Sequence, residues 1–513
     1  MSELKKLIAD DYLKIVEGLE VEQKTSEDIL KELLNSIVEI DFKLLAFPET
    51  IKLEARLCEI KKSLKNGKDE TLQTEAEALE KKLAGFKLNK NHYLILCIEQ
   101  LLKIAESNEW GLSKKDGSIF LYDGTYHKEI GKESFQHFLG NIALKMGVEK
   151  FKCKIHTFKD ELYKQFLAES YLETPEGNKD NVLINLNNGT MEITPFGKKL
   201  RPFRRDDFLT HKLSFDYDKD AKAPIFRKYL NDVLPDPNKQ KVLAEFMGYV
   251  FTKGLKKEKA LVLLGTGANG KSVFFEIICA LLGRENISSY AIESLTTDAN
   301  YSRAKISNKL VNYASEMNGR LDANMFKQLV SIEPIQARLP YGEPFMIEDY
   351  AKLIFNCNEL PKDTEHTHAF FRRFLILNFD VTIAEHKQDK ELHTKIINNE
   401  LSGVFNWVLE GLDNLLLQRD FTVCKAVDNA RLDYEKTTDS AMLFVEEMDY
   451  KKSIDNYTSI KTLYDEYKIF CFDDGFRALN KHNFMKRLSH HKLIIKRISE
   501  GNVCFIAKNN LTI

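Results

Sequence analysis

A glycine-rich segment between two apolar runs constrains this chain more than any other feature. Residues 261–264 read Leu-Val-Leu-Leu and predict a buried strand, and residues 265–272 continue as Gly-Thr-Gly-Ala-Asn-Gly-Lys-Ser. Residues 273–282 are rich in apolar side chains, as in a buried helix, and Gly283 ends them. A strand, a G-x-x-x-x-G-K-S loop and a helix in this order predict an α/β fold whose loop holds the phosphates of a nucleoside triphosphate.

Each residue type in this loop has its own task in binding phosphate. Glycines let backbone N–H groups turn inward, and the helix start adds the positive end of its dipole. Lys271 is predicted to reach the β- and γ-phosphates, and the Ser272 hydroxyl to bind Mg²⁺. An ordinary strand–turn–helix does not need Lys and Ser directly after a glycine. The predicted ATP and Mg²⁺ site is therefore Gly265, Thr266, Gly267, Ala268, Asn269, Gly270, Lys271 and Ser272.

Length and composition indicate a globular chain of several domains. It has 513 residues, 43% hydrophobic and 30% charged, with a formal net charge of −2. No signal pattern and no apolar run of about 18 residues is visible, so no membrane segment is expected. The eight cysteines form no C-x-x-C pair, which argues against a zinc site and a disulfide framework and favours a reducing cytoplasm.

Two regions are expected before the glycine-rich loop. Residues 1–90 read as helices, and leucines at helical spacing on both sides of a turn at 66–69 predict an antiparallel helical hairpin. The hairpin would serve assembly or partner contact, or would be a solvated, charged hairpin without such a role. Residues 91–250 predict a mixed α+β domain, with β-hairpins at 119–127 and 182–193.

Three regions are expected from the loop onward: a motor at 251–400, a helical connector at 401–445 and a separate unit at 446–513. The last unit shows helix, helix, strand, turn and strand, the order of a winged helix. Residues 481–497 contain no acid, which predicts nucleic-acid binding; a face for an acidic partner domain is the alternative. The basic candidates are Lys481, Lys486, Arg487, Lys492, Lys496 and Arg497.

Polar residues at strand ends add groups that ATP hydrolysis needs. An apolar run at 309–314 leads to Glu316, a candidate to bind Mg²⁺ and to order the attacking water. A second apolar strand ends at Asn358, whose amide can sense the γ-phosphate. Arg372 and Arg373 stand just before a third strand. A salt-bridged strand entrance is the alternative reading of this arginine pair.

Further segments complete a recognisable order. Within the motor they are 327–329, 337–345, 358–361 and 371–374; outside it they are 187–189, 208–210, 215–218, 246–249 and 403–412. Together with the loop, this order resembles the superfamily 3 helicases, most closely the branch of phage, plasmid and poxvirus helicase-primases. The resemblance covers residues 180–513 and implies an AAA+-like motor in a hexameric or similar ring, with each ATP held between two subunits.

The resemblance also implies roles for individual residues. One subunit would supply Lys271, Ser272, Glu316 and Asn358. Its neighbour would supply an arginine finger, matched by Arg372 or Arg373, of a kind typically worth about 10³–10⁵ in rate. Residues 332–347 match a hairpin that points into the ring pore, where Arg338 and the nearby Lys327 would grip DNA phosphates. Movement would proceed along one strand from its 3′ end.

The chain departs from the family pattern in three places. Residues 331–335 read Ser-Ile-Glu-Pro-Ile where many relatives have glycines and an acid, which would alter the entry turn of the hairpin. Ser315 stands beside Glu316 in place of a second acid. Relatives often carry a primase domain, whereas here only Glu39 and Asp41 have the spacing of a metal pair, in a Leu-rich helical stretch. Primase activity is not predicted, and a separate primase is among the partners considered.

These features together predict an ATP-dependent, ring-forming DNA helicase that acts on single-stranded and forked DNA during replication of a phage, plasmid or other mobile element. Two rivals remain. One is a replication initiator or loader that ATP controls and that unwinds little. The other is a small-molecule P-loop kinase, against which the length, the paired arginines and the basic C-terminal run all argue.

Overall fold

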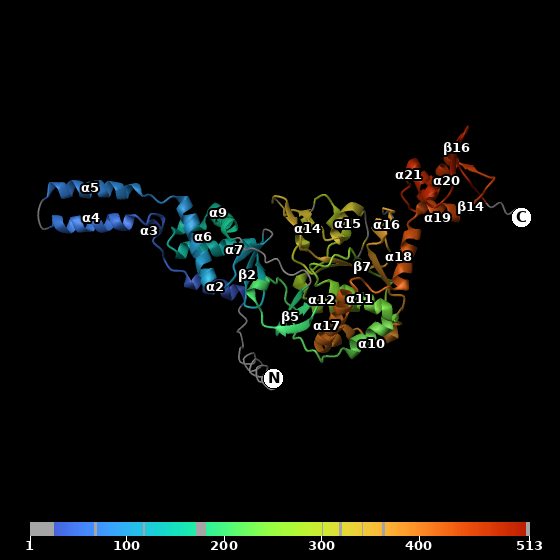
Figure 1. Ribbon diagram of the computed structural model, residues 1–513, viewed down its shortest axis with the longest axis horizontal. Helices are drawn as coiled ribbons and strands as arrows, with labels where there is room; N and C mark the ends of the chain where they lie inside the picture. Colours follow the sequence, from blue (N-terminus) through green and yellow to red (C-terminus); the bar gives the residue numbers. More distant parts are fainter. Residues whose placement is uncertain are drawn as a thin grey trace.

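The computed structural model describes residues 25–65, 69–115, 118–170, 181–299, 301–315, 317, 321–340, 342–361 and 365–508. Figure 1 shows an elongated molecule with a helical arm at one end, an α/β body and a small C-terminal unit at the other end. Among the described residues, no helix combines the length and the apolar character needed to cross a membrane.

The arm is the helical hairpin expected from the leucine spacing. Helix α4 (Thr50–Leu64) runs antiparallel to α5 (Glu70–Gly85), and the two project away from the body (Figure 1). Ion pairs cross between the helices, among them Arg56–Glu75 at 3.0 Å and Lys61–Glu80 at 2.7 Å. The role of the arm in assembly stays a prediction.

The remaining N-terminal elements surround one hydrophobic core. They are α2 (Ser26–Ser36), α3 (Phe42–Ala46), α6 (Lys90–Ser107), β1 (Ser113–Lys115), β2 (Ser118–Tyr122), β3 (His127–Ile130), α7 (Lys132–Lys145), α8 (Lys150–Lys154) and α9 (His156–Glu169). Strands β2 and β3 form the expected first hairpin, with Tyr122 opposite His127.

The division of the chain at residues 90 and 250 does not follow the hydrophobic cores. Ile29 and Leu33, from the first region, are buried in the same core as Phe135 and Phe166. The second expected hairpin, at 182–193, instead belongs to the core of the motor. Sequence periodicity finds the helices, but which apolar faces meet depends on contacts between distant segments.

A second antiparallel sheet and three helices cover one side of the motor. The sheet is β4 (Val182–Leu186), β5 (Gly189–Thr194) and β6 (Gly197–Arg201), in that order. The helices are α10 (Pro224–Val233), α11 (Pro237–Tyr249) and α17 (Leu392–Gln418). Their side chains share a core with α12 (Lys271–Leu282). Residues 401–418 of the expected connector at 401–445 thus pack within the motor, whereas residues 440–445 belong to the C-terminal unit.

Glycines allow α11 and α17 to approach closely. A Cβ on Gly411 would lie 2.2 Å from the carbonyl carbon of Ala244, and one on Gly248 would lie 2.7 Å from Leu412. Nearby, the Asn406 amide donates to the carbonyl of Asp218 at 2.9 Å and to that of Ala221 at 3.0 Å. These contacts explain the Gly and Asn positions of the segment 403–412.

The motor is built on a five-stranded parallel sheet. Its order is β13 (Phe374–Asn378), β7 (Ala260–Leu264), β12 (Lys352–Cys357), β9 (Val311–Ala314) and β8 (Ile287–Ser288). The remaining elements between residues 205 and 437 are η1 (Arg205–Asp207), η2 (Arg284–Asn286), α13 (Ile292–Thr296), α14 (Tyr301–Ile306), α15 (Ala323–Val330), β10 (Ile335–Ala337), β11 (Phe345–Ile347), α16 (His368–Phe371), η3 (Glu385–Lys387) and α18 (Lys425–Thr437). The mixed α/β architecture with a parallel sheet is as expected.

The C-terminal unit has its own small core. Its elements are α19 (Ser440–Glu447), β14 (Tyr450–Lys452), β15 (Thr458–Ser459), α20 (Ile460–Asp473), α21 (Lys481–His490), β16 (Ile495–Ile498), β17 (Gly501–Cys504) and β18 (Ile506–Lys508). Ser459 caps α20 and Asn480 caps α21 through their side chains. A three-stranded antiparallel sheet, in the order β15-β17-β16, packs behind the helices.

Candidate functional site

The glycine-rich loop follows β7, where the order in which strands are added to the motor sheet reverses. After β7 the chain continues to β8 at one edge of the sheet, whereas after β12 it crosses to β13 on the other side of β7. In open parallel sheets, ligands bind outside the carboxyl ends of strands at such a switch point. A cleft of about 1350 Å³ opens there, lined by the loop, by Ser315 after β9, by Asn358 after β12 and by residues 381–395 after β13.

The backbone of the glycine-rich loop is suited to an anion. Gly267 and Gly270 have φ of +120° and +86°, where glycine meets little steric cost, and Ala268 joins them at +47°. In the described part of the chain, the N–H groups of residues 266–270 donate no backbone hydrogen bond. Helix α12 begins directly at Lys271, so its positive end faces the cleft. These groups fit an oxyanion such as a phosphate.

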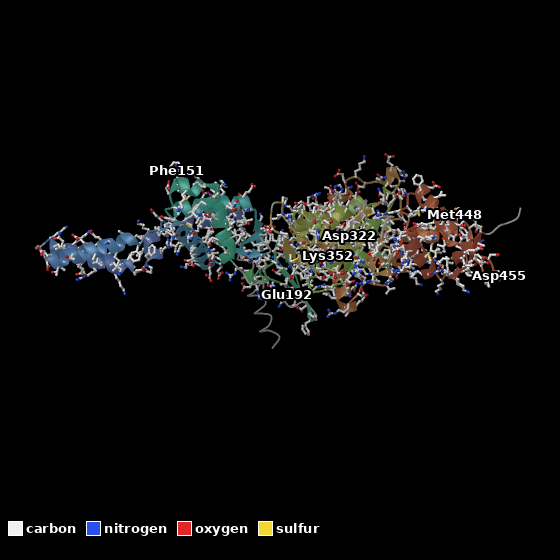
Figure 2. All side chains as sticks on the ribbon, turned by 90° about the horizontal axis from the view of Figure 1, so that it is seen from above. Phe151, Glu192, Asp322, Lys352, Met448 and Asp455 are labelled. Carbon is white, nitrogen blue, oxygen red and sulfur yellow. The ribbon has the colours of Figure 1, made fainter. Side chains whose placement is uncertain are left out.

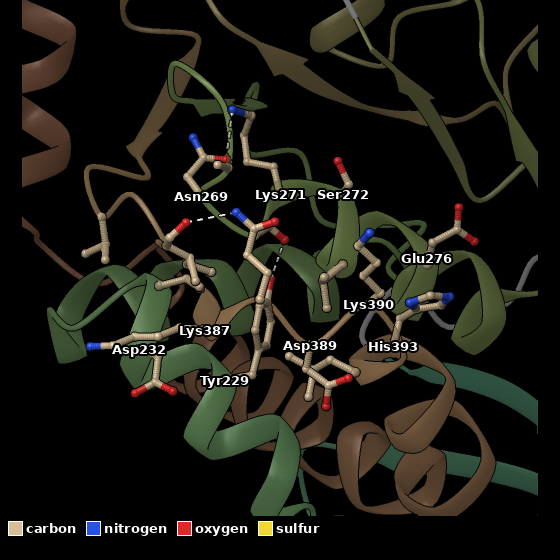
Figure 3. Close-up of a pocket in the computed structure, with 18 of the residues that line it drawn as sticks. Tyr229, Asp232, Asn269, Lys271, Ser272, Glu276, Lys387, Asp389, Lys390 and His393 are labelled. Atoms are coloured by element: carbon tan, nitrogen blue, oxygen red, sulfur yellow. Dashed lines mark hydrogen bonds between the residues drawn. The ribbon is translucent and has the colours of Figure 1, made fainter. Parts of the chain in front are cut away.

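Lys271 is folded against its own loop. Its ammonium donates to the carbonyl of Gly265 and, at 3.2 Å, to Oδ1 of Asn269. Burial lowers the pKa of Lys271. Figure 3 shows Lys271 and Asn269 turned toward each other at the loop, with Ser272 beside them on α12. The ammonium therefore lies inside the curve of the loop, where it would meet a phosphate.

Helix α10 supports the loop from below. The Tyr229 hydroxyl donates to the Gly270 carbonyl at 2.8 Å, and burial raises the pKa of this phenol far above its ordinary range. A Cβ on Gly270 would lie 2.7 Å from Cγ1 of Val233. Sequence reasoning missed Tyr229 and Val233, because nothing in a helical segment 40 residues upstream shows which of its side chains faces the loop.

The chain after β13 closes the other side of the cleft. The Ile383 N–H donates to the Ala268 carbonyl at 2.8 Å, and Phe379 N–H donates to the Leu264 carbonyl at 2.7 Å. This segment and the start of α17 place Asp389, Lys390 and His393 at the cleft (Figure 3). The sequence analysis did not select these three residues, and no motif marks them.

Polar residues that follow two of the parallel strands line the cleft, at the carboxyl ends of those strands. Asn358 is exposed at the cleft after β12, and Ser315 lines the cleft after β9. Glu316, the predicted Mg²⁺ and water-ordering acid, lies outside the described residues. Since the strands are parallel, their carboxyl ends bring Lys271, Ser315 and Asn358 to the same cleft, although they are far apart in the sequence.

The arginine pair lies at the opposite ends of the strands, where β7 and β13 begin. The Arg373 carbonyl accepts from Ala260 N–H, at the start of β7. Five-residue β7 separates it from the loop, roughly 13 Å at about 3.3 Å per residue. Arg373 is buried and contacts Ser331 Oγ at 3.2 Å, and its pKa is lowered by burial. The Arg372 side chain is 45% exposed and pairs with Glu258. Arg373 also pairs with Glu258, at 3.4 Å, as in the salt-bridged strand entrance considered above, so the two arginines share an acid and differ in burial.

Strands β10 and β11 form a β-hairpin; Lys327 lies on the helix before it, and Arg338 directly follows β10 between the two strands. Lys327 on α15 pairs with Glu365 at 3.0 Å, and exposed Arg338 donates to the Gly342 carbonyl at 2.8 Å. The entry turn is unusual. Ile332 has φ of +50°, a left-handed conformation that a β-branched residue rarely adopts, and Glu333 N–H donates to the Gln328 carbonyl at 3.3 Å.

The basic residues of the C-terminal unit have different surroundings. Lys481 and Lys486 are exposed on α21. Lys492, Lys496 and Arg497 are also exposed, after α21 and on β16. Arg487 differs from them, because its guanidinium contacts the His366 carbonyl at 3.0 Å and ring Nδ1 at 2.7 Å. Arg487 is thus occupied by a contact with the motor, unlike the five exposed cations.

Comparisons with known families match two separate segments. Residues 263–373 match a family of unknown function, DUF5906, and residues 99–235 match a family described as D5 N terminal like. A protein of Acanthamoeba polyphaga mimivirus named "Putative helicase L207/L206" is 22% identical over 248 residues. That match covers 45% of this chain and 25% of the mimivirus protein, so the chain matches about a quarter of its relative's length.

Solved structures that match this chain include those of the C-terminal region of NrS-1. Its A form without ligand has a TM-score of 0.43 at 13% identity, covering 81% of this chain and 98% of that region. A second structure, of residues 305–718 of NrS-1, has a TM-score of 0.43 at 14% identity and covers 81% and 99%. By sequence, the chain is thus similar to one viral protein named as a putative helicase and, over residues 99–235, to the family described as D5 N terminal like.

Proposed function

We propose that this chain is an ATP-driven DNA helicase of the superfamily 3 type that replicates the DNA of a phage, virus or plasmid-like element. The observation that carries the proposal is the cleft at the switch point of the parallel sheet, where the glycine-rich loop, Lys271 and Asn358 converge. The similarity to a mimivirus protein named as a helicase supports the choice of reaction. ATP with Mg²⁺ would supply the free energy, with Ser272 and Glu316 as the expected metal ligands.

The placement of the arginines favours a motor whose sites lie between subunits. Arg372 is at the sheet edge opposite its own loop, so it is poorly placed to reach a nucleotide in its own cleft. The Arg372 side chain is 45% exposed, so a neighbouring copy can reach it if the contact with Glu258 is exchanged, whereas Arg373 is buried and also contacts Ser331. We therefore assign the in-trans role to Arg372, in a ring that we propose to be a hexamer.

The exposed hairpin tip and the C-terminal unit are the proposed DNA contacts. Arg338 at the hairpin would grip one strand, and the exposed cations on α21 and β16 would bind duplex or forked DNA through phosphates. A winged-helix role for this unit is supported by the two capped helices before a β16–β17 hairpin.

Strand displacement on a forked DNA tests the proposal. The native chain should displace a strand with ATP when the tail is 3′, and Lys271→Ala should not. A chain that hydrolyses ATP in a DNA-stimulated manner without displacement would instead be an initiator or loader. Hydrolysis without any DNA stimulation would favour a small-molecule kinase and refute the helicase.

A further inference from the structure

The segment 365–373 joins the C-terminal unit to the arginine pair. It begins with the loop residues Glu365, His366 and Thr367, continues as the four-residue helix α16 and ends at Arg372 and Arg373. Figure 1 shows α16 at the side of the motor that faces α21. Contacts at both ends of this segment are specific, so it can transmit a displacement from one end to the other.

Arg487 attaches α21 to the beginning of the segment. Its Nη1 donates to the His366 carbonyl at 3.0 Å and lies 2.7 Å from the ring Nδ1. The other ring nitrogen, Nε2, lies 2.6 Å from the Glu435 carbonyl, so the neutral ring donates there and accepts from Arg487. Asp439, 3% exposed in its side chain, lies 3.9 Å from Nε of Arg487 and 2.7 Å from Nε2 of His491. Arg487 is therefore held on two sides.

The rest of the segment is packed tightly against its own neighbours. The His366 ring contacts the Phe371 ring edge-on at 5.0 Å, and Thr367 caps α16. Arg372 N–H donates to the His368 carbonyl at 3.0 Å. Because these contacts make the one-turn helix rigid, it cannot absorb a shift of His366. Such a shift is therefore passed on to Arg372.

The same segment contacts the helix that precedes the hairpin. Glu365 accepts from Thr367 Oγ1 at 2.8 Å and from the Lys327 ammonium at 3.0 Å. The loop 365–367 thus touches the C-terminal unit through His366 and α15 through Glu365. It is the point where the two proposed DNA-contacting parts meet the arginine pair.

We propose that Arg487 and His366 are positioning residues for Arg372, so that the placement of the C-terminal unit controls ATP hydrolysis. The inference rests on the proposed function, since it assumes that Arg372 acts on a neighbour's nucleotide. In this proposal Arg487 makes no phosphate contact, and Lys481 and Lys486 are the residues of α21 that bind the phosphates of a nucleic acid. A nucleic acid bound on the exposed side of α21 then changes the turnover rate rather than the affinity for ATP.

Steady-state ATP hydrolysis by the full chain with forked DNA tests this. Arg487→Ala should lower kcat by about 10- to 100-fold, the effect of a catalytic group displaced by about 1 Å, while KM for ATP stays within about twofold. Ser489→Ala, an exposed residue on the same helix, is the matched control and should retain the native kcat. His366→Asn keeps an acceptor oxygen near the Nδ1 position and should recover part of the rate that His366→Ala loses.

A double-mutant cycle with Arg372→Ala separates positioning from general destabilisation. If Arg487 acts through Arg372, adding Arg487→Ala to Arg372→Ala should cause no further loss of kcat. The inference would be overturned if the double variant lost kcat by the product of the two single losses, which means that the free-energy changes add. A native kcat in Arg487→Ala with weakened DNA binding would overturn it as well. Urea unfolding of each variant shows whether it is folded. A native chain that hydrolyses no ATP would refute the proposed function itself, which is a different result from additive losses in an active chain.

Discussion

Replacing Gly270 by alanine tests how closely α10 supports the phosphate loop. At φ of +86° an alanine costs about 1–2 kcal/mol, because its Cβ crowds the carbonyl. That Cβ would also lie 2.7 Å from Cγ1 of Val233 and 3.1 Å from Cε2 of Tyr229, an overpacking that costs about 1–3 kcal/mol. We expect Gly270→Ala to destabilise the motor by about 2–5 kcal/mol in total.

The overpacking part can be isolated with Val233→Ala, which removes the methyl group that the new Cβ would strike. In a double-mutant cycle, Gly270→Ala with Val233→Ala should lose about 1–3 kcal/mol less than the sum of the single changes. Gly267→Ala is the matched control: Gly267 also has positive φ, but a Cβ there would have nothing within 4 Å. Its effect should add to that of Val233→Ala.

Urea unfolding of the full chain measures these differences, with hydrogen exchange of α10 and α12 peptides to report the motor's own opening. The loop should also bind a fluorescent ATP analogue more weakly in Gly270→Ala, because the Tyr229 contact at the Gly270 carbonyl is displaced. Additivity of the Gly270 and Val233 changes to within about 0.5 kcal/mol would contradict this contact. It would mean that the loop does not rest on α10.

Three further results are expected. Burial lowers the pKa of His127 to about 4, against about 6.5 in the unfolded chain, so the unfolded chain takes up the proton first on acidification. The contribution of His127 to stability is complete above pH 6.5 and should fall by up to about 3 kcal/mol toward pH 4. Urea unfolding of His127→Phe should lose this pH dependence, and an identical slope in the variant would contradict the assignment. Gly411→Ala should destabilise by about 3 kcal/mol, since its Cβ would strike the backbone of Ala244; Gly85→Ala, with open space around it, should be near neutral in the same unfolding assay, and equal effects would be evidence against the close helix contact. Arg372→Ala should lower ATP turnover by about 10³-fold or more and should poison rings of mixed subunits, whereas activity that falls only in proportion to dilution would exclude a role in trans.

Local patterns account for the parts of the fold that were predictable. Alternating apolar runs and glycines indicated β7, the loop and α12, and Ser459 and Asn480 marked the starts of α20 and α21. These features depend on residues close in sequence, such as a cap and the N–H three residues later. The position of Asn358 at the cleft also followed, because polar residues that end parallel strands collect at the carboxyl ends of the strands.

Other features depended on pairs of surfaces that lie far apart in the chain. The helices at 26–46 share their core with residues 90–170, and the β-hairpin at 182–193 packs with the motor, although neither grouping leaves a mark in local composition. Tyr229 was missed for the same reason, since its hydroxyl reaches the loop only once α10 is packed below it. Helical periodicity gives a buried face without naming what covers it.

Residue types and their order were enough to indicate the glycine-rich loop, the strand and helix around it, and the basic character of the C-terminal run. Tertiary packing determines which of two adjacent arginines is exposed, and it turns Arg487 away from the other cations toward His366. The reason is that chemistry belongs to a residue type and short-range order to neighbouring residues, whereas burial and pairing are properties of surfaces that meet only in the folded chain.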